Sequence, residues 1–210
     1  MDLKKRAEEM RTFFDRKTDG YDEVHAKFAG TKRLLTEGLP DGIRNVLDLG
    51  AGTGLELFPL FERFPEARVT VIDISEGMLS ALAKRPFADR LTVVCGDFFE
   101  TDFGGPYDAA ISTSALHHFA PQEKQKLYER IHACLAPGGI FLNSDKIVFD
   151  RNEERDTLAS YFRDPAQYPH MDTPLAPSTE MELLENAGFG KITVALTDRE
   201  DYRLYAAVRD

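Results

Sequence analysis

The sequence is poor in cysteine. Its 210 residues include only two, Cys95 and Cys134, and the interval between them matches no metal-binding motif. A scaffold that depends on disulfides and a zinc site built from cysteines are therefore both excluded. Both cysteines lie in apolar stretches, so we expect two buried free thiols.

Long apolar runs are missing as well. No stretch approaches the roughly 20 apolar residues that a membrane-spanning helix requires. The first ten residues, MDLKKRAEEM, are too charged for a signal peptide. The sequence therefore predicts a cytoplasmic protein that has no membrane partner.

Positive charge is scarce relative to negative charge. Lysine and arginine together number 26 against 36 aspartates and glutamates, which gives a formal net charge of −10. A field of this sign repels polyphosphate, so we expect no nucleic-acid partner. The basic cluster Lys4 to Arg6 is diluted by Glu8 and Glu9, and it predicts a solvated helix face.

Hydrophobic residues, at 42%, are present in the usual proportion for a globular domain. From residue 43, short apolar segments typical of buried strands alternate with segments of helical period. The predicted strands are 44–49, 67–74, 89–97, 107–115 and 138–145, and the predicted helices are 55–64, 75–85 and 121–135. Such an alternation predicts right-handed βαβ units around a parallel sheet.

The two ends of the chain depart from this alternation. Residues 2–16 and 22–38 are predicted to form two helices ahead of the first strand. After residue 146 the sequence predicts a helix at 148–164, a proline-rich segment at 165–177, and a helix at 178–189 that starts at Ser178 or Thr179. Two strands, 191–198 and 202–210, predict an antiparallel edge on a mostly parallel sheet.

Three glycines stand where the first predicted strand gives way to a helix, in NVLDLGAGTGLELFPLFERF, residues 45–64. Gly50 permits a tight turn, Gly52 brings bare backbone to a ligand, and Gly54 lets the helix approach the sheet. Ligands of open α/β sheets bind beyond the carboxyl ends of the strands, where a helix N-terminus attracts an anionic group. The alternative is a glycine-rich turn without a ligand. A dinucleotide fingerprint is disfavoured, because it needs glycine at position 55, where Leu55 stands.

The segment VLDLGAGTG resembles the first motif of the class I S-adenosylmethionine-dependent methyltransferases. Four later segments are similar to further motifs of that family, in order: VIDIS, CGDFF, YDAAISTSALHHF and LAPGGIFLNSD. This resemblance covers residues 43–146 and implies S-adenosyl-L-methionine as the cofactor. It also implies an α/β, Rossmann-like fold: a seven-stranded, mostly parallel sheet with an antiparallel last strand, helices on both faces and an N-terminal helical cap.

With this resemblance the chain divides into four expected parts. Residues 1–42 form the N-terminal helical cap, and residues 43–146 form the S-adenosylmethionine-binding core. Residues 147–177 form a cap or lid segment, and residues 178–210 add a helix and antiparallel strands that complete the core. The aromatic residues of 147–177 suit either a lid over the substrate or plain packing, and the sequence leaves both open.

The family motifs imply cofactor-binding roles by position. Asp73 ends the second strand and is expected to bind the ribose hydroxyls, with Ile74 and Met78 as apolar walls. Asp97 and Phe98 are expected to bind the adenine edge and ring. Asp48 is expected either to orient the glycine loop or to face the amino group of the methionine moiety. The remaining candidates, in or around the loop, are Tyr21, Gly50, Ala51, Gly52, Gly54 and Thr113.

The catalytic residues are less constrained by the pattern. The cofactor supplies an activated methyl group, so the protein mainly has to place the acceptor in line with the departing sulfur. A general base is needed only where the acceptor must lose a proton. His117 and Asp145 are the candidates, and of the adjacent His117 and His118 at most one is expected to face the site.

The sequence therefore predicts an enzyme that methylates a small molecule by in-line transfer, acting as a monomer or a homodimer. No NPPY-like segment follows the fourth strand, which disfavours amino-methylation of adenine or glutamine. Two alternatives remain open: an enzyme that modifies the sulfonium in the manner of carboxy-S-adenosylmethionine synthase, and a non-catalytic cofactor-binding module. A third, a nicotinamide-dependent oxidoreductase, is disfavoured by the G-x-G-x-G spacing and by the GDFF segment. The first needs an arginine beside the methyl group, for which Arg151, Arg155 and Arg163 are candidates.

Overall fold

A single seven-stranded sheet forms the centre of the protein in this computed structural model, which describes residues 3–168 and 170–210. The strands are β1 (Asn45–Leu49), β2 (Arg68–Asp73), β3 (Leu91–Cys95), β4 (Tyr107–Thr113), β5 (Leu135–Lys146), β6 (Phe189–Leu196) and β7 (Tyr202–Arg209), in the order β3-β2-β1-β4-β5-β7-β6. Neighbours from β3 to β5 pair in parallel. Strand β7 is antiparallel to both β5 and β6. The predicted sheet, mostly parallel with an antiparallel last strand, is thus confirmed; the antiparallel pair β6–β7 lies at one edge, with β6 outermost.

The helices are α1 (Leu3–Asp15), α2 (Tyr21–His25), α3 (Ala29–Glu37), α4 (Leu57–Arg63), α5 (Glu76–Leu82), α6 (Pro121–Cys134), α7 (Arg151–Arg163) and α8 (Pro177–Asn186). The predicted helix at 22–38 is interrupted by a 3₁₀ turn, η1 (Ala26–Phe28). Helix α8 begins at Pro177 with Ala176 as its N-cap, so the prediction of a start at Ser178 or Thr179 is wrong. Proline is favoured at a first helical position because it has no N–H to leave unpaired.

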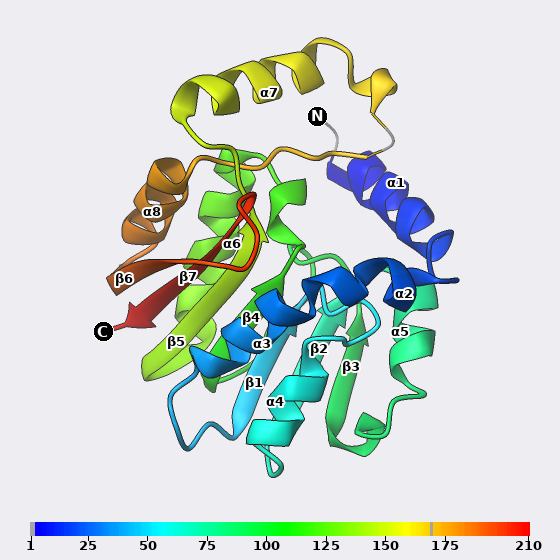
Figure 1. The fold of residues 1–210 in the computed structure, drawn as a ribbon, viewed down its shortest axis with the longest axis vertical. Coiled ribbons are helices and arrows are strands. Elements are labelled where there is room, and N and C mark those ends of the chain that lie inside the picture. Colours follow the sequence, from blue (N-terminus) through cyan, green and yellow to red (C-terminus); the bar gives the residue numbers. More distant parts are fainter. Residues whose placement is uncertain (1–2, 169) are drawn as a thin grey trace.

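Helices cover both faces of the sheet (Figure 1). One buried apolar cluster joins the sheet to α3, α4 and α5, and a second joins it to α6 and α8. Side chains alternate along a strand, so in β1 Val46 belongs to the first cluster, and Leu47 and Leu49 belong to the second. The same alternation puts Asp48 on the face covered by α3 and α4.

Helix α1 and the segment around α7 lie beyond one end of the sheet (Figure 1). Helix α1 ends at Asp15, whose Oδ1 accepts hydrogen bonds from Ser75 Oγ at 2.6 Å and from the Gly77 N–H at 3.0 Å. These bonds attach the end of α1 to the start of α5. On the other side, Tyr161 of α7 and Met171 form a small buried cluster with Ala120. The ring centroids of Phe13 on α1 and His170 lie 4.1 Å apart, so α1 and the segment that follows α7 meet above the strand ends.

The two thiols differ in environment. Both cysteines are free, and Cys134 is buried, but Cys95 is exposed because it lies on β3, at the edge of the sheet. The prediction of two buried thiols is therefore wrong for Cys95. Within residues 3–168 and 170–210, no helix has the length and apolar character to cross a bilayer.

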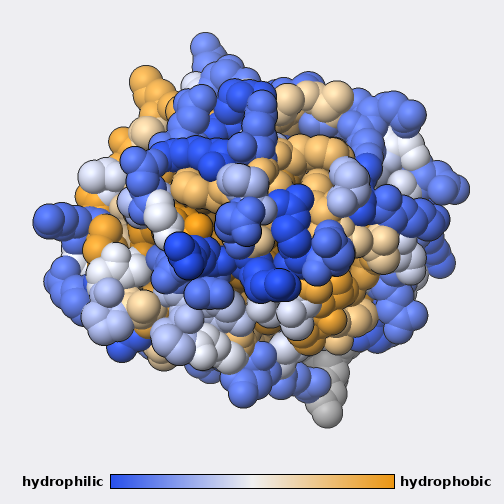
Figure 2. Space-filling model, turned by 90° about the horizontal axis from the view of Figure 1, so that it is seen from below, coloured by the Kyte–Doolittle hydropathy of each residue, from blue (hydrophilic) through white to orange (hydrophobic). Residues whose placement is uncertain are grey.

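Hydrophobic and hydrophilic residues are interspersed on the surface that Figure 2 shows from below. Its hydrophobic patches are interrupted by hydrophilic side chains that cross the middle of the view. Scattered apolar groups of this kind are normal on a protein surface. The hollow that concerns function lies elsewhere, at the carboxyl ends of the strands.

Candidate functional site

The glycine loop after β1 turns by positive backbone angles. Gly50, Gly52 and Gly54 have φ values of 78°, 53° and 76°, a region that side chains other than glycine rarely adopt. A Cβ on Gly50 would lie 2.5 Å from Cβ of Ala115, and one on Gly54 would lie 2.3 Å from a methyl group of Leu82. A Cβ on Gly52 would instead make only ordinary van der Waals contact with Tyr21, whose hydroxyl would be 3.8 Å away. Gly52 is therefore the position where bare backbone faces a ligand-sized gap.

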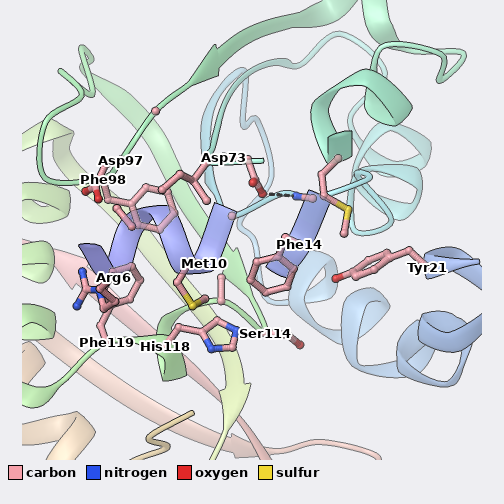
Figure 3. A pocket seen from close by; sticks show the side chains of 17 residues that line it. Arg6, Met10, Phe14, Tyr21, Asp73, Asp97, Phe98, Ser114, His118 and Phe119 are labelled. Atoms are coloured by element: carbon pink, nitrogen blue, oxygen red, sulfur yellow. Dashed lines mark hydrogen bonds between the residues drawn. The ribbon is translucent and has the colours of Figure 1, made fainter. Parts of the chain in front are cut away.

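A cavity that is partly open to solvent lies between this loop and α1 (Figure 3), and its empty space, with the open part included, is about 700 Å³. Eight of the predicted cofactor residues line it: Tyr21, Gly50, Gly52, Asp73, Ile74, Met78, Asp97 and Phe98. Six of them lie at or just after the ends of three neighbouring strands, because parallel strands bring their carboxyl ends to the same edge; Tyr21 lies on α2 and Met78 on α5.

Asp73 is fixed by two backbone donors. Its Oδ2 accepts from the Gly52 N–H at 2.8 Å, shown dashed in Figure 3, and its Oδ1 accepts from the Ser75 N–H at 2.9 Å. Burial raises the pKa of this carboxyl, while the N–H donors partly offset that effect. Each carboxylate oxygen keeps a further lone pair, so Asp73 can also accept from ligand hydroxyls.

Asp97 and Phe98 occupy the turn after β3. Asp97 Oδ1 accepts from the Phe99 N–H at 2.7 Å, and the Phe98 ring is buried against the cavity. Arg130 of α6 donates to the carbonyls of Phe98 and Thr101, which holds the turn from behind. The turn thus presents an acceptor and a flat apolar surface side by side, a combination suited to an adenine ring.

A smaller cavity of about 290 Å³ adjoins the first at Tyr21, Gly50 and Ser114. Ala51 and Thr113 line it, and Thr113 Oγ1 is buried without a hydrogen-bond partner among the described residues. Gly54 and Asp48 line neither cavity. Gly54 instead leaves the room that Leu82 occupies, as the short distance from a Cβ at this position shows.

Asp48 neighbours Glu56, which lines the smaller cavity. Asp48 is fully buried, and neither of its carboxyl oxygens has a hydrogen-bond partner in the described structure. Burial and the neighbouring Glu56 raise the pKa of Asp48 well above the ordinary value. Lys32 also lines the smaller cavity, and its Nζ donates to Glu56 Oε2 at 2.8 Å.

His118, not His117, is the histidine that lines the large cavity. Its Nδ1 lies 2.7 Å from the carbonyl oxygen of Met171, so Nδ1 carries the proton and Nε2 is free to accept one. Burial lowers the pKa of His118 well below 6.5, and the neighbouring His117 adds to this effect. The ring is therefore neutral at neutral pH.

His117 and Asp145 form a pair outside both cavities. His117 Nδ1 lies 2.6 Å from Asp145 Oδ1, and both side chains are buried. Burial by itself raises the pKa of Asp145, but the adjacent His117 and its hydrogen bond bring the net value below the ordinary one. Both histidines belong to the 3₁₀ turn η3 (Leu116–His118), but only His118 lines the cavity.

Helix α1 contributes a wall that the sequence analysis missed. Arg6, Met10 and Phe14 follow one another at four-residue intervals along it and line the cavity (Figure 3). The prediction of a solvated Arg6 is wrong: its side chain is buried, pairs with Glu123, and lies 4.9 Å from the ring centroid of Phe119. The four-residue spacing of Arg6, Met10 and Phe14 in the sequence was the signal from which this wall could have been predicted.

The predicted arginines of the cap lie elsewhere. Arg151 pairs with Glu182 at 2.6 Å and Arg155 with Asp156 at 3.1 Å, both on the surface. Arg163 is exposed as well. None of the three lines either cavity.

Fold and site together define an α/β protein that binds a nucleoside cofactor beyond the carboxyl ends of its strands. Comparison with known proteins narrows this class. Residues 46–139 match the family model described as a methyltransferase domain. An uncharacterized methyltransferase of Geobacillus kaustophilus is 31% identical over 147 residues, which are 69% of this chain and 67% of that protein.

Two further similarities bear on the fold and on the cofactor. The carboxy-S-adenosyl-L-methionine synthase of Nautilia profundicola is 26% identical over 166 residues, which are 71% of this chain and 70% of that protein. The crystal structure of human N-acetylserotonin methyltransferase in complex with S-adenosylmethionine superimposes with a TM-score of 0.73 at 23% identity, covering 93% of this chain and 55% of that one. The chain spans between 35% and 70% of the first curated relatives that it matches.

The chain belongs to the class I S-adenosylmethionine-dependent methyltransferases. The residues present fit that cofactor. Gly52 leaves the space that a Cβ would fill, Asp73 is fixed to accept from hydroxyls, and Thr113 Oγ1 is buried without a partner beside the smaller cavity.

Proposed function

We propose that the protein transfers the methyl group of S-adenosylmethionine to a small-molecule acceptor. One observation carries the proposal: a single cavity joins the strand-end residues Asp73 and Phe98 to a second group of lining residues, Met10, Phe14 and His118. The first group suits a nucleoside, and the second leaves room for another molecule beside it. When two reactants are held side by side in one cavity, most of the entropic cost of their encounter is met on binding, before the reaction.

The cofactor, when bound, supplies a methyl group on a sulfonium, and the chain's task is to hold it in place. We assign Asp73 to the ribose hydroxyls, Asp97 and Phe98 to adenine, and Ile74 and Met78 to the apolar sides of the nucleoside. Tyr21 stands between the two cavities and closes the site from α2. Its hydroxyl stays protonated, because burial raises its pKa.

His118 is the proposed proton acceptor. A hydroxyl that attacks a methyl group must lose its proton, and an unprotonated Nε2 can take it. The carbonyl of Met171 orients the ring by accepting from Nδ1. The pair His117–Asp145 packs behind this histidine, with ring centroids of His117 and His118 4.0 Å apart, and we assign it a positioning role.

The acceptor is proposed to be small, mainly apolar and uncharged. Ala7, Met10, Phe14 and Phe119 give this part of the cavity an apolar lining. The charge of Arg6 is already balanced by Glu123. We further propose that the protein works in the cytoplasm as a monomer or homodimer, and that its net charge of −10 disfavours nucleic acid as acceptor.

Modification of the sulfonium is a second candidate, since Arg6 is an arginine within the cavity and one relative carries the name of such a synthase. It is less well supported, because Arg6 is committed to Glu123 and lies beside Phe119. Mass spectrometry of the nucleoside that co-purifies with the protein separates the two reactions. A carboxylated sulfonium nucleoside would favour the synthase.

The main test is to incubate the protein with S-adenosylmethionine deuterated in the methyl group and a fraction of small metabolites. We expect one or more metabolites to gain the mass of a CD₃ group with equimolar release of S-adenosylhomocysteine. Binding of the cofactor without any labelled product from any fraction would contradict methyl transfer and favour a binding module.

A further inference from the structure

Ser114 adopts a backbone conformation that serine rarely takes. Its φ is 55°, and among the residues that the structure describes it is the one residue other than glycine with a positive φ. Such an angle brings Cβ close to the following carbonyl oxygen, so it persists only where surrounding contacts impose it. Ser114 also lines both cavities, at the place where they adjoin. A strained residue at such a place indicates a role in the site.

Two hydrogen bonds hold Ser114 in this conformation. Its N–H donates to the carbonyl of Ser144 on β5 at 2.9 Å, and its Oγ donates to the hydroxyl oxygen of Tyr202 on β7 at 3.1 Å. The first bond is available to almost any residue, so the second is what the serine side chain adds. Tyr202 is only 5% exposed, and its ring centroid lies 5.3 Å from that of Phe28. Packing therefore fixes the hydroxyl that accepts from Ser114.

The turn at Ser114 determines where the following residues lie. The chain passes here from β4 into η3, the 3₁₀ turn that ends with His118. Ala115, directly after Ser114, packs against the glycine loop, since a Cβ on Gly50 would lie 2.5 Å from the Cβ of Ala115. A different φ at Ser114 would redirect Ala115 and η3 together. The conformation of Ser114 therefore sets the position from which the His118 ring reaches the large cavity.

We propose that Tyr202 is a positioning residue for the reaction: its hydroxyl keeps Ser114 in the left-handed conformation, and Ser114 keeps the His118 ring in the cavity. Tyr202 lines neither cavity, so it acts through Ser114 and not on a ligand. Burial raises the pKa of Tyr202 to about 12, so its hydroxyl stays protonated and does not replace His118 as the base. The inference rests on the proposed function, in which His118 is that base.

Nuclear magnetic resonance of the protein with ¹⁵N in its histidine rings tests this proposal without any ligand. A ring with the proton fixed on Nδ1 gives two well-separated ¹⁵N shifts, which we expect for His118 at neutral pH. Its signals are identified by their loss in His118→Asn. Tyr202→Phe removes one hydroxyl and keeps the ring. We expect the two His118 shifts to converge in this variant, because the turn relaxes and the bond to the Met171 carbonyl is broken for part of the time.

A second substitution separates positioning from packing. Glycine adopts a positive φ without strain, so Ser114→Gly no longer needs the hydroxyl. Tyr202→Phe combined with Ser114→Gly should therefore show the well-separated His118 shifts of the unchanged protein. A role for Tyr202 in packing against Phe28 alone would give the same change with either residue at position 114. Tyr205→Phe is the matched control, because Tyr205 is also buried on β7 but its hydroxyl has no partner in the described structure. It should leave His118 unchanged.

Steady-state kinetics adds a second measurement once the labelling experiment has identified an acceptor. Tyr202→Phe should lower kcat by about tenfold to 10²-fold at unchanged KM, since a misplacement of about 1 Å costs about 10²-fold. The combined variant with Ser114→Gly should recover most of that loss. Thermal unfolding of each variant checks that it is folded. If Tyr202→Phe does not fold, Ser114→Ala replaces it, because alanine keeps the strained φ and loses the same hydrogen bond.

The outcomes separate this inference from the proposed function. Unchanged His118 shifts in folded Tyr202→Phe would overturn the positioning role, and so would equal convergence with and without Ser114→Gly. Either result leaves methyl transfer standing. Absence of any labelled product, together with converging shifts that Ser114→Gly restores, would contradict methyl transfer and leave the positioning of His118 by Tyr202 standing.

Discussion

The two halves of the large cavity are built from different parts of the chain. The cofactor half consists of residues that directly follow β1, β2 and β3, and the hydrogen-bonded strands hold their backbone in place. The acceptor half consists of side chains from α1, from the turn η3 and from Phe119 next to that turn. A few polar contacts attach α1, among them Asp15 to Ser75 and Arg11 to the Ile74 carbonyl.

This difference suggests that the two halves of the cavity have different roles. The cofactor is the same throughout the family, so its half of the site can be fixed by the sheet. The acceptor half is attached by contacts that can change without disturbing the sheet, which allows one fold to serve different acceptors. Four experiments test whether the cofactor half and the acceptor half have these separate roles.

The largest effect is expected from Gly52→Val. A branched side chain would enter the cavity and force a strained backbone angle at φ 53°, so cofactor binding should become undetectable by calorimetry. Gly138→Val is the control, because Gly138 has a φ of 76° but nothing within 4 Å of a Cβ. It should bind normally despite a similar backbone strain. Unchanged affinity in Gly52→Val would contradict the loop assignment.

His118→Asn should lower kcat by about 10²–10⁴-fold while cofactor affinity stays within twofold. A base works in its deprotonated form, which is present above its pKa. Because burial lowers the pKa of His118 well below 6.5, kcat should stay level as pH falls through 6.5 and decline only at lower pH. His132→Asn, on α6 against Phe189, is the control. A pH profile that bends near 6.5 would argue against His118.

Asp73→Ala should weaken S-adenosylhomocysteine binding by about 1.5–3 kcal/mol, the range for charge-assisted hydrogen bonds. The matched control is Asp108→Ala. Asp108 also accepts two backbone N–H bonds, from Arg44 and Asn45, but it lies at the opposite end of the sheet. If both variants lose affinity equally, the effect is one of stability, and the ribose binds elsewhere.

The smallest effect is expected from Asp15→Ala, which removes the bonds to Ser75 and Gly77. Net hydrogen bonds of this kind contribute about 0.5–1.5 kcal/mol each. Hydrogen exchange in α1 should accelerate, and cofactor affinity should fall only a few-fold. Glu8→Ala removes an exposed pair with Arg11 and should change neither. Loss of the whole fold in Asp15→Ala would show that α1 belongs to the core.

Some residues of the site could be predicted from the sequence, and others could not. Asp73, Asp97 and Phe98 were predicted to line a cofactor site and do line the cavity, because strand ends converge wherever parallel strands pair. His117 was preferred to its neighbour, and the structure brings His118 to the cavity instead. Nothing in an adjacent pair of histidines indicates which ring turns inward, since that depends on the 3₁₀ turn and on the carbonyl of Met171 far along the chain.

The sequence by itself determined the order of strands and helices, the glycine loop and the acids at the strand ends, since these follow from local period and from residues adjacent in the chain. Only the tertiary structure decided the insertion of β7 beside β5, the burial of Arg6 against Glu123, and the meeting of Asp48, Glu56 and Lys32. Each of these joins segments that are distant in sequence. Their contacts depend on which faces pack together, and no local pattern encodes that choice.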